Sequence, residues 1–188
     1  VQGIMGRFVP CLPVHINEFG ENGIWFDYQR YCRPFITEEI LHEMFGEMTS
    51  IIKEQYITAN DFGGYDLKPA FETQVQVEEY FATLEQSEEN SKLKLGLFDL
   101  IANVILFEEE KHSSGKEGSE QAEEFHFRIS MEKTLSFQHL IPYVQDKLKA
   151  LYVNYFFRRQ DEFWYTEAMY KLPKLKAVTN MLVCGEDL

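Results

Sequence analysis

Apolar residues recur at helical spacing through most of this chain, which restricts the fold to a mainly α-helical class. After Thr37, the apolar residues that share one helical face are Ile40, Leu41, Met44, Phe45, Met48, Ile51 and Ile52. The Thr37 hydroxyl suits an N-cap because it can accept a hydrogen bond from the first turn, where Glu38 and Glu39 add favourable negative charge. We expect Gly46 to divide this segment into two shorter helices.

The same periodicity predicts three further helices. One spans residues 73–81, and a second covers about 87–107. The longest begins at Pro142, since proline is tolerated in the first turn of a helix. Its apolar face is expected to extend to Tyr170, before Pro173 ends the helix.

Strand signals are few and short. Residues 1–36 are rich in proline, glycine and aromatic residues, so we expect loops there, with a short helix near 27–31. A turn is expected at 60–64 and an extended piece at 125–129. Residues 181–185 resemble a buried strand of a parallel sheet, and acidic residues follow them directly.

Acidic residues outnumber basic ones in this 188-residue chain by 31 to 18, which gives a net charge of −13. No basic stripe is present, so binding to nucleic acid or to an anionic membrane surface is disfavoured. Residues 108–124 are acidic, of low complexity and almost without apolar side chains, and we expect a mobile, solvated loop there. The longest apolar run, 100–107, is far too short to cross a bilayer.

The three cysteines, Cys11, Cys32 and Cys184, are scattered along the chain. This pattern fits buried thiols in a reducing cytoplasm better than a disulfide framework, and no signal peptide is visible, so we expect a cytoplasmic protein. The chain begins with Val1 rather than methionine and ends at Leu188, which leads us to expect a segment of a longer protein.

No metal site or cofactor is predicted. His42 and Glu43 begin like the helix of a zinc protease, but the second histidine that a metal would need one turn later is missing. The other four histidines are dispersed among different segments. Residues 158–164 are interpreted as a solvated helix face with ion pairs within the helix and a buried Trp164.

Glu186 is the candidate catalytic residue. It follows the predicted 181–185 strand, where α/β barrels place catalytic groups, although spacing alone favours a surface acid at this position.

Three stretches together resemble a known family. They are GRFVPCLP at 6–13, FFRRQDEFW at 156–164 and MLVCGEDL at 181–188. These motifs resemble the 4-alpha-glucanotransferases (amylomaltase or disproportionating enzyme, glycoside hydrolase family 77), in the long form that carries a helical insertion. Shorter pieces at 33–36, 77–81 and 125–129 agree in the same order, so the resemblance covers essentially the whole chain.

The resemblance implies a place for this chain within a larger fold. It would be a mainly α segment inserted in a (β/α)8 barrel glycoside hydrolase, with few short strands, including 181–185. Residues 1–36 would be a loop-rich stretch after one barrel strand, residues 37–180 the helical insertion with its acidic loop 108–124, and residues 181–188 a barrel strand that ends at the catalytic face.

The resemblance also implies a retaining, double-displacement mechanism. The family uses an aspartate nucleophile and a glutamate acid/base, and the final motif of this chain gives the acid/base role to Glu186. Retention needs two carboxyl groups about 5–5.5 Å apart. Nothing here matches the segment that carries the nucleophile, so that aspartate is expected upstream of Val1, and the chain alone is expected to be inactive.

Two classes of function therefore follow from the sequence. The first is part of a 4-alpha-glucanotransferase that acts on α-1,4-glucans such as maltose, maltooligosaccharides and glycogen- or starch-like polymers. The alternative is a non-enzymatic helical domain whose acidic face and aromatic residues bind another protein.

Overall fold

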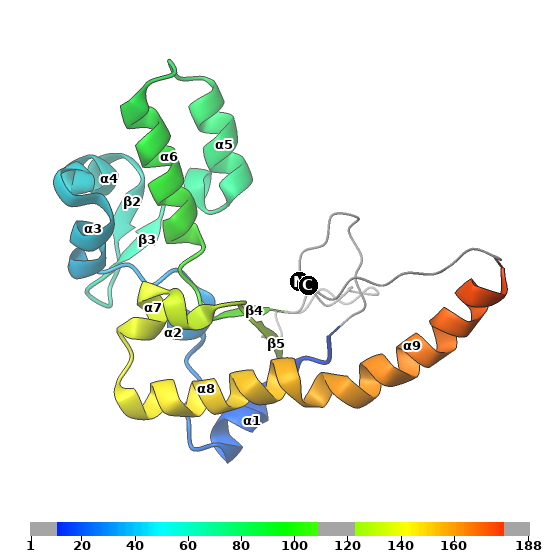
Figure 1. Ribbon diagram of the computed structural model, residues 1–188. Coiled ribbons are helices and arrows are strands. Elements are labelled where there is room, and N and C mark those ends of the chain that lie inside the picture. Colours follow the sequence, from blue (N-terminus) through cyan, green and yellow to red (C-terminus); the bar gives the residue numbers. More distant parts are fainter. Residues whose placement is uncertain (1–10, 109–122, 179–188) are drawn as a thin grey trace, which may run out of the picture.

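The computed structural model describes residues 11–108 and 123–178 (Figure 1). This part of the chain is mainly helical, and its short strands form two small antiparallel sheets. The predicted strand 181–185 and most of the predicted acidic loop lie outside the described residues. Within the described ranges, no helix has the length and apolar character to cross a membrane.

Residues 36–101 form the first lobe, which has an apolar core of its own. Its elements, with 3₁₀ helices labelled η, are α3 (Glu38–Phe45), η1 (Gly46–Met48), α4 (Thr49–Gln55), β2 (Ile57–Ala59), β3 (Tyr65–Leu67), η2 (Pro69–Phe71), α5 (Gln74–Ala82) and α6 (Glu88–Ile101). Figure 1 shows α5 and α6 side by side, with α3 and α4 on the other side of the lobe.

Hydroxyl side chains cap three helix starts in the first lobe, and the cap at Thr37 is the one that the sequence predicts. The hydroxyl of Thr37 accepts a hydrogen bond from Ile40 N at 3.3 Å, and Ser87 caps α6 in the same way. Thr73 forms a reciprocal capping box with Gln76 at the start of α5. Gly46, at φ 54°, ends α3, which confirms the predicted division of that segment.

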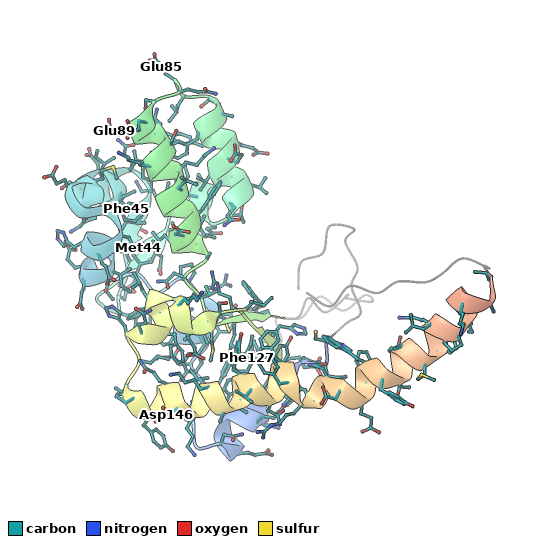
Figure 2. The ribbon with its side chains drawn as sticks, viewed as in Figure 1. Met44, Phe45, Glu85, Glu89, Phe127 and Asp146 are labelled. Carbon is teal, nitrogen blue, oxygen red and sulfur yellow. The ribbon has the colours of Figure 1, made fainter. Side chains whose placement is uncertain are left out.

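The second lobe combines residues 11–35 with residues 102–108 and 123–157 around a separate core. Its elements are β1 (Val14–His15), α1 (Ile16–Glu21), α2 (Tyr28–Cys32), β4 (Leu106–Glu108), β5 (Glu124–Phe127), η3 (Met131–Lys133), α7 (Leu135–Gln138) and α8 (Pro142–Phe157). The strands pair in the order β1-β5-β4, with Val14 opposite Phe125 and Leu106 opposite Phe127. This sheet packs on α8, toward which Phe127 points (Figure 2). The centre of the Phe127 ring lies 5.6 Å from the centre of the Tyr155 ring.

Several predicted boundaries need correction around this sheet. The helix predicted over 87–107 ends at Ile101, because Asn103 and Ile105 bond to segments far away in the chain and the following residues join the sheet as β4. Glu108 and Glu124, predicted as the ends of a loop, belong to β4 and β5.

The loop-rich prediction for residues 1–36 missed β1 and α1 but placed α2 correctly. The turn at 60–64 is confirmed, and the strands β2 and β3 that flank it were missed.

The long helical segment after Pro142 also differs from expectation. It breaks at Arg158, whose φ and ψ are −134° and −61°, and continues as α9 (Arg159–Ala177), which extends away from both lobes (Figure 1). Pro173 lies inside α9 instead of ending it. Proline removes one helical hydrogen bond, and the carbonyl that it frees belongs to Met169, on an exposed part of the helix where water can take its place.

Candidate functional site

The predicted catalytic residue, Glu186, lies outside the described residues, and so does Cys184. Within residues 11–108 and 123–178, no group of three or more potential metal-binding side chains comes together. Cys11 and Cys32 are free cysteines in the described part of the chain. Burial raises the pKa of the Cys32 thiol to about 12, so this thiol is protonated at neutral pH and is a poor nucleophile.

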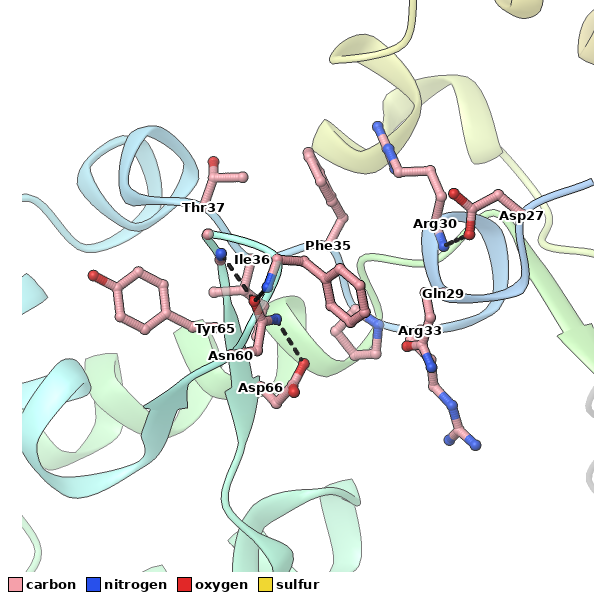
Figure 3. Close-up of a pocket in the computed structure, with 14 residues that line it drawn as sticks. Asp27, Gln29, Arg30, Arg33, Phe35, Ile36, Thr37, Asn60, Tyr65 and Asp66 are labelled. Atoms are coloured by element: carbon pink, nitrogen blue, oxygen red, sulfur yellow. Dashed lines mark hydrogen bonds between the residues drawn. The ribbon is translucent and has the colours of Figure 1, made fainter. Parts of the chain in front are cut away.

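A surface groove lies between the two lobes, and we call it the interlobe groove (Figure 3). It consists of two adjoining cavities of about 470 and 310 Å³. Their walls come from α2, from the segment 33–37 that connects the lobes, and from the β2–β3 hairpin. The residues that line both cavities are Gln29, Arg33, Pro34, Ile36 and Asp66.

The β2–β3 turn that forms one wall is held by the side chain of Asn60. Its Oδ1 accepts hydrogen bonds from Phe62 N at 3.1 Å and Gly64 N at 3.0 Å, while its Nδ2 donates to Asp66 Oδ1 at 3.1 Å. Such a turn is typical of asparagine, whose short side chain imitates a backbone turn. Phe62 is presented to solvent at the tip of the turn with 89% of its surface exposed.

The hairpin meets the connecting segment in a close backbone contact. Tyr65 N donates to the carbonyl of Ile36 at 3.0 Å. A Cβ atom added to Gly64 would lie 2.7 Å from that same carbonyl oxygen, so only glycine fits here without displacing the backbone. This contact fixes the hairpin against the opposite wall of the groove.

Arg30 supports the other wall from behind. Its Nη1 donates to Ser136 Oγ at 2.6 Å, its Nη2 donates to the Ser136 carbonyl, and its guanidinium carbon lies 3.6 Å from the centre of the Phe35 ring. Burial lowers the pKa of Arg30 to about 10, so the group remains charged at neutral pH. Figure 3 shows Arg30 and Arg33 pointing in opposite directions from α2.

The open side of the groove carries polar side chains that are not engaged in hydrogen bonds or ion pairs within the described structure. Among the described residues, the side chains of Gln29, Arg33 and Glu72 make no hydrogen bond or ion pair, although the Arg33 guanidinium lies 5.3 Å from the Tyr28 ring. Asp66 bonds only through one of its oxygens in this part of the structure. The groove thus offers unused hydrogen-bond donors and acceptors, as a binding surface would.

A second polar cluster lies at the start of α9 and corrects the interpretation of residues 158–164. Arg159 forms an ion pair with Glu18 of α1, not with a neighbour on its own helix. Gln160, only 1% exposed, donates to the Leu12 carbonyl at 3.0 Å and accepts from Leu12 N at 2.9 Å. Trp164, predicted as buried, is 45% exposed because α9 has left the second lobe at that point.

Comparison with known proteins shows a similarity to a curated protein. The chain is 31% identical over 193 aligned residues to the 4-alpha-glucanotransferase DPE2 of Oryza sativa subsp. japonica. This chain resembles a segment of a 4-alpha-glucanotransferase. The alignment covers 99% of this chain and 19% of the relative, so the chain spans about a fifth of that protein. The predicted resemblance is thereby confirmed.

No family model matches the chain. No solved structure matches it either.

Proposed function

We propose that this chain is the central part of a 4-alpha-glucanotransferase, which moves α-1,4-glucan segments between maltooligosaccharides and glycogen- or starch-like acceptors. The observation that carries this proposal is 31% identity to a 4-alpha-glucanotransferase along 99% of the chain. The three ordered motifs at 6–13, 156–164 and 181–188 support it, because the last of them carries the expected acid/base.

In this proposal the described lobes are a helical insertion in a (β/α)8 barrel, and residues 181–188 return to a barrel strand. Glu186 protonates the oxygen of the leaving sugar and then removes the proton from the acceptor hydroxyl. An aspartate outside this chain attacks the anomeric carbon, so the 188-residue chain alone is inactive. A cytoplasmic location is supported by the free Cys11 and Cys32.

The substitution Glu186→Gln in the full-length protein tests the role of this residue. The amide has nearly the same size but cannot deliver a proton, so transfer from maltotriose should fall by about 10²–10⁴-fold or more. A glycosyl fluoride needs little protonation to leave, so formation of the glycosyl-enzyme from this donor should fall much less. Carbohydrate chromatography of the products and fluoride release measure the two reactions.

The matched control is Asp187→Asn, which removes a neighbouring carboxylate without touching the proposed acid/base. It should retain far more transfer activity than Glu186→Gln. Equal losses with both donors, or no loss with either, would show that Glu186 is not the acid/base.

A helical protein-interaction domain is the second candidate function. It is favoured by the exposed apolar side chains that α9 carries beyond the second lobe, among them Tyr165, Met169 and Tyr170. This alternative predicts that Glu186→Gln leaves the activity of the full-length protein unchanged.

A further inference from the structure

We propose that the interlobe groove binds a short stretch of α-1,4-linked glucose chain. The choice of α-glucan among the oligosaccharides rests on the proposed function above. That the ligand is an uncharged, hydroxyl-rich and elongated molecule follows from the groove itself.

The shape of the groove suits an elongated ligand. Its two cavities, of about 470 and 310 Å³, adjoin along five shared lining residues, so they form one continuous path from Asp27 to Glu72. Each has the size of pockets that bind small molecules, which is about 300–1,000 Å³. A ligand that occupies both would contact α2 on one side and the β2–β3 hairpin on the other.

The charges in the groove favour a neutral ligand. The guanidinium of Arg33, which has no ion pair among the described residues, would repel a cation, whereas the carboxylates of Asp27, Asp66 and Glu72 would repel an anion such as a phosphate. A sugar hydroxyl both donates and accepts hydrogen bonds, so the hydroxyls of a sugar can donate to the carboxylates, accept from the guanidinium and do either with the Gln29 amide. The acids and Arg33 are therefore complementary to a polyol.

An aromatic ring stands at the rim of this polar path. Phe62 is held outward by the two hydrogen bonds that Asn60 accepts, and its ring makes no contact that the fold needs within the described residues. The C–H face of a glucose ring is apolar and packs well on an aromatic side chain. Phe62 thus provides a flat surface beside the hydrogen-bonding groups.

The walls of the groove are fixed before any ligand arrives. Arg30 ties α2 to Ser136, and the contact between Ile36 and Tyr65 locks the hairpin to the connecting segment. A preformed site lowers the conformational entropy lost on binding, which matters for a weakly bound sugar.

Titration of the 188-residue chain with maltotetraose, followed by NMR, tests the proposal. We expect saturable binding with shift changes concentrated at the groove. Phe62→Ala should weaken binding at least about fivefold, because it removes the aromatic surface on which a glucose ring would pack, and Phe62→Tyr should restore binding because the ring remains. Trp25→Ala is the matched control, since Trp25 is 88% exposed but lines neither cavity, and it should bind as the unmodified chain does.

Three results would overturn the proposal. These are no saturable binding by a chain that unfolds cooperatively, equal weakening by Phe62→Ala and Trp25→Ala, and equally tight binding of cellotetraose, whose glucose units are β-linked. Maltotriose transfer by the full-length protein is measured separately. Loss of the proposed transfer activity with intact maltotetraose binding would count against the enzyme assignment and leave the groove as a glucan site.

Discussion

Buried and half-buried polar side chains at the start of α9 join segments that are far apart in the sequence. Gln160 satisfies both backbone groups of Leu12, and Arg159 reaches Glu18 and the carbonyl of Pro13. Each buried polar group that loses its partner costs about 1–3 kcal/mol. The helix that leaves the second lobe is therefore anchored by specific hydrogen bonds as well as by apolar contact.

Glu18→Gln should make the free energy of unfolding fall less steeply as the pH is lowered into the acidic range. Burial by itself raises the pKa of Glu18, but hydrogen bonds from Arg159 and from His15 N outweigh it, so the pKa lies below its usual 4.5. A carboxyl with a lowered pKa stabilises the fold above its unfolded-state pKa, and this stabilisation disappears as the pH falls through the lowered value. Urea unfolding of both proteins from neutral to acidic pH measures the two profiles.

Glu21→Gln is the control for this titration, because Glu21 lies on the same helix and has no ion pair among the described residues. Its profile should follow that of the unmodified chain. If Glu18→Gln loses stability in acid as steeply as the unmodified chain does, the contact with Arg159 contributes nothing to the pH dependence.

At the scale of single elements, packing decides where a helix can lie. Gly96 sits in the interior of α6, where alanine would ordinarily be favoured by about 1 kcal/mol. A Cβ at this position would lie 2.4 Å from Cε1 of Phe45, a buried residue of α3 (Figure 2). The glycine lets α6 approach α3 closely enough to close the core of the first lobe.

Gly96→Ala should therefore destabilise the chain by about 1–3 kcal/mol despite its better helix propensity. The free energy of unfolding in urea measures this effect. Gly20→Ala in α1 is the control, since nothing lies within 4 Å of its added Cβ, and it should be neutral or stabilising. In a Phe45→Leu background the further loss on Gly96→Ala should shrink, and an undiminished loss would contradict a clash with this ring.

Helix starts were predictable because their signals are local. Thr37, Thr73, Ser87 and Pro142 all stand at the first turns that the sequence assigns to them. Ends were less predictable, because long-range contacts decide them. The segment after Ile101 leaves the helix to make contacts with α2 and α7 that no short window of sequence contains.

At the scale of the whole molecule, two separate apolar cores meet at a small polar junction. Asn103, 4% exposed, accepts from Ser136 N at 2.8 Å and donates to the Phe35 carbonyl at 3.2 Å.

The groove beside this junction could not be predicted, because its walls come from residues 27–37 and 60–72 and become neighbours only when both lobes have folded. Glu186 could be proposed through family resemblance, since spacing alone favours a surface acid.

Asn103→Leu should weaken the coupling between the lobes. Leucine has a similar size but leaves the Ser136 amide and the Phe35 carbonyl unpaired, at a cost of about 1–3 kcal/mol. Calorimetry should show a lower midpoint and a broader unfolding transition that resolves into two as the lobes unfold separately. The control is Asn17→Leu, because the side chain of Asn17 has no hydrogen bond in the described structure, and this variant should unfold in a single transition. A single transition in Asn103→Leu as well would contradict the coupling of the lobes through Asn103.

The pairing of β4 with β5 has a consequence for how this chain can vary in length. Glu108 lies directly opposite Phe125, so the two points at which residues 109–122 join the sheet are neighbours in one ladder. A connection between such neighbours can double in length at an entropic cost of only about 0.6 kcal/mol. Insertions and deletions here would leave both lobes in place, which makes this connection a natural position for a reporter peptide or an affinity tag.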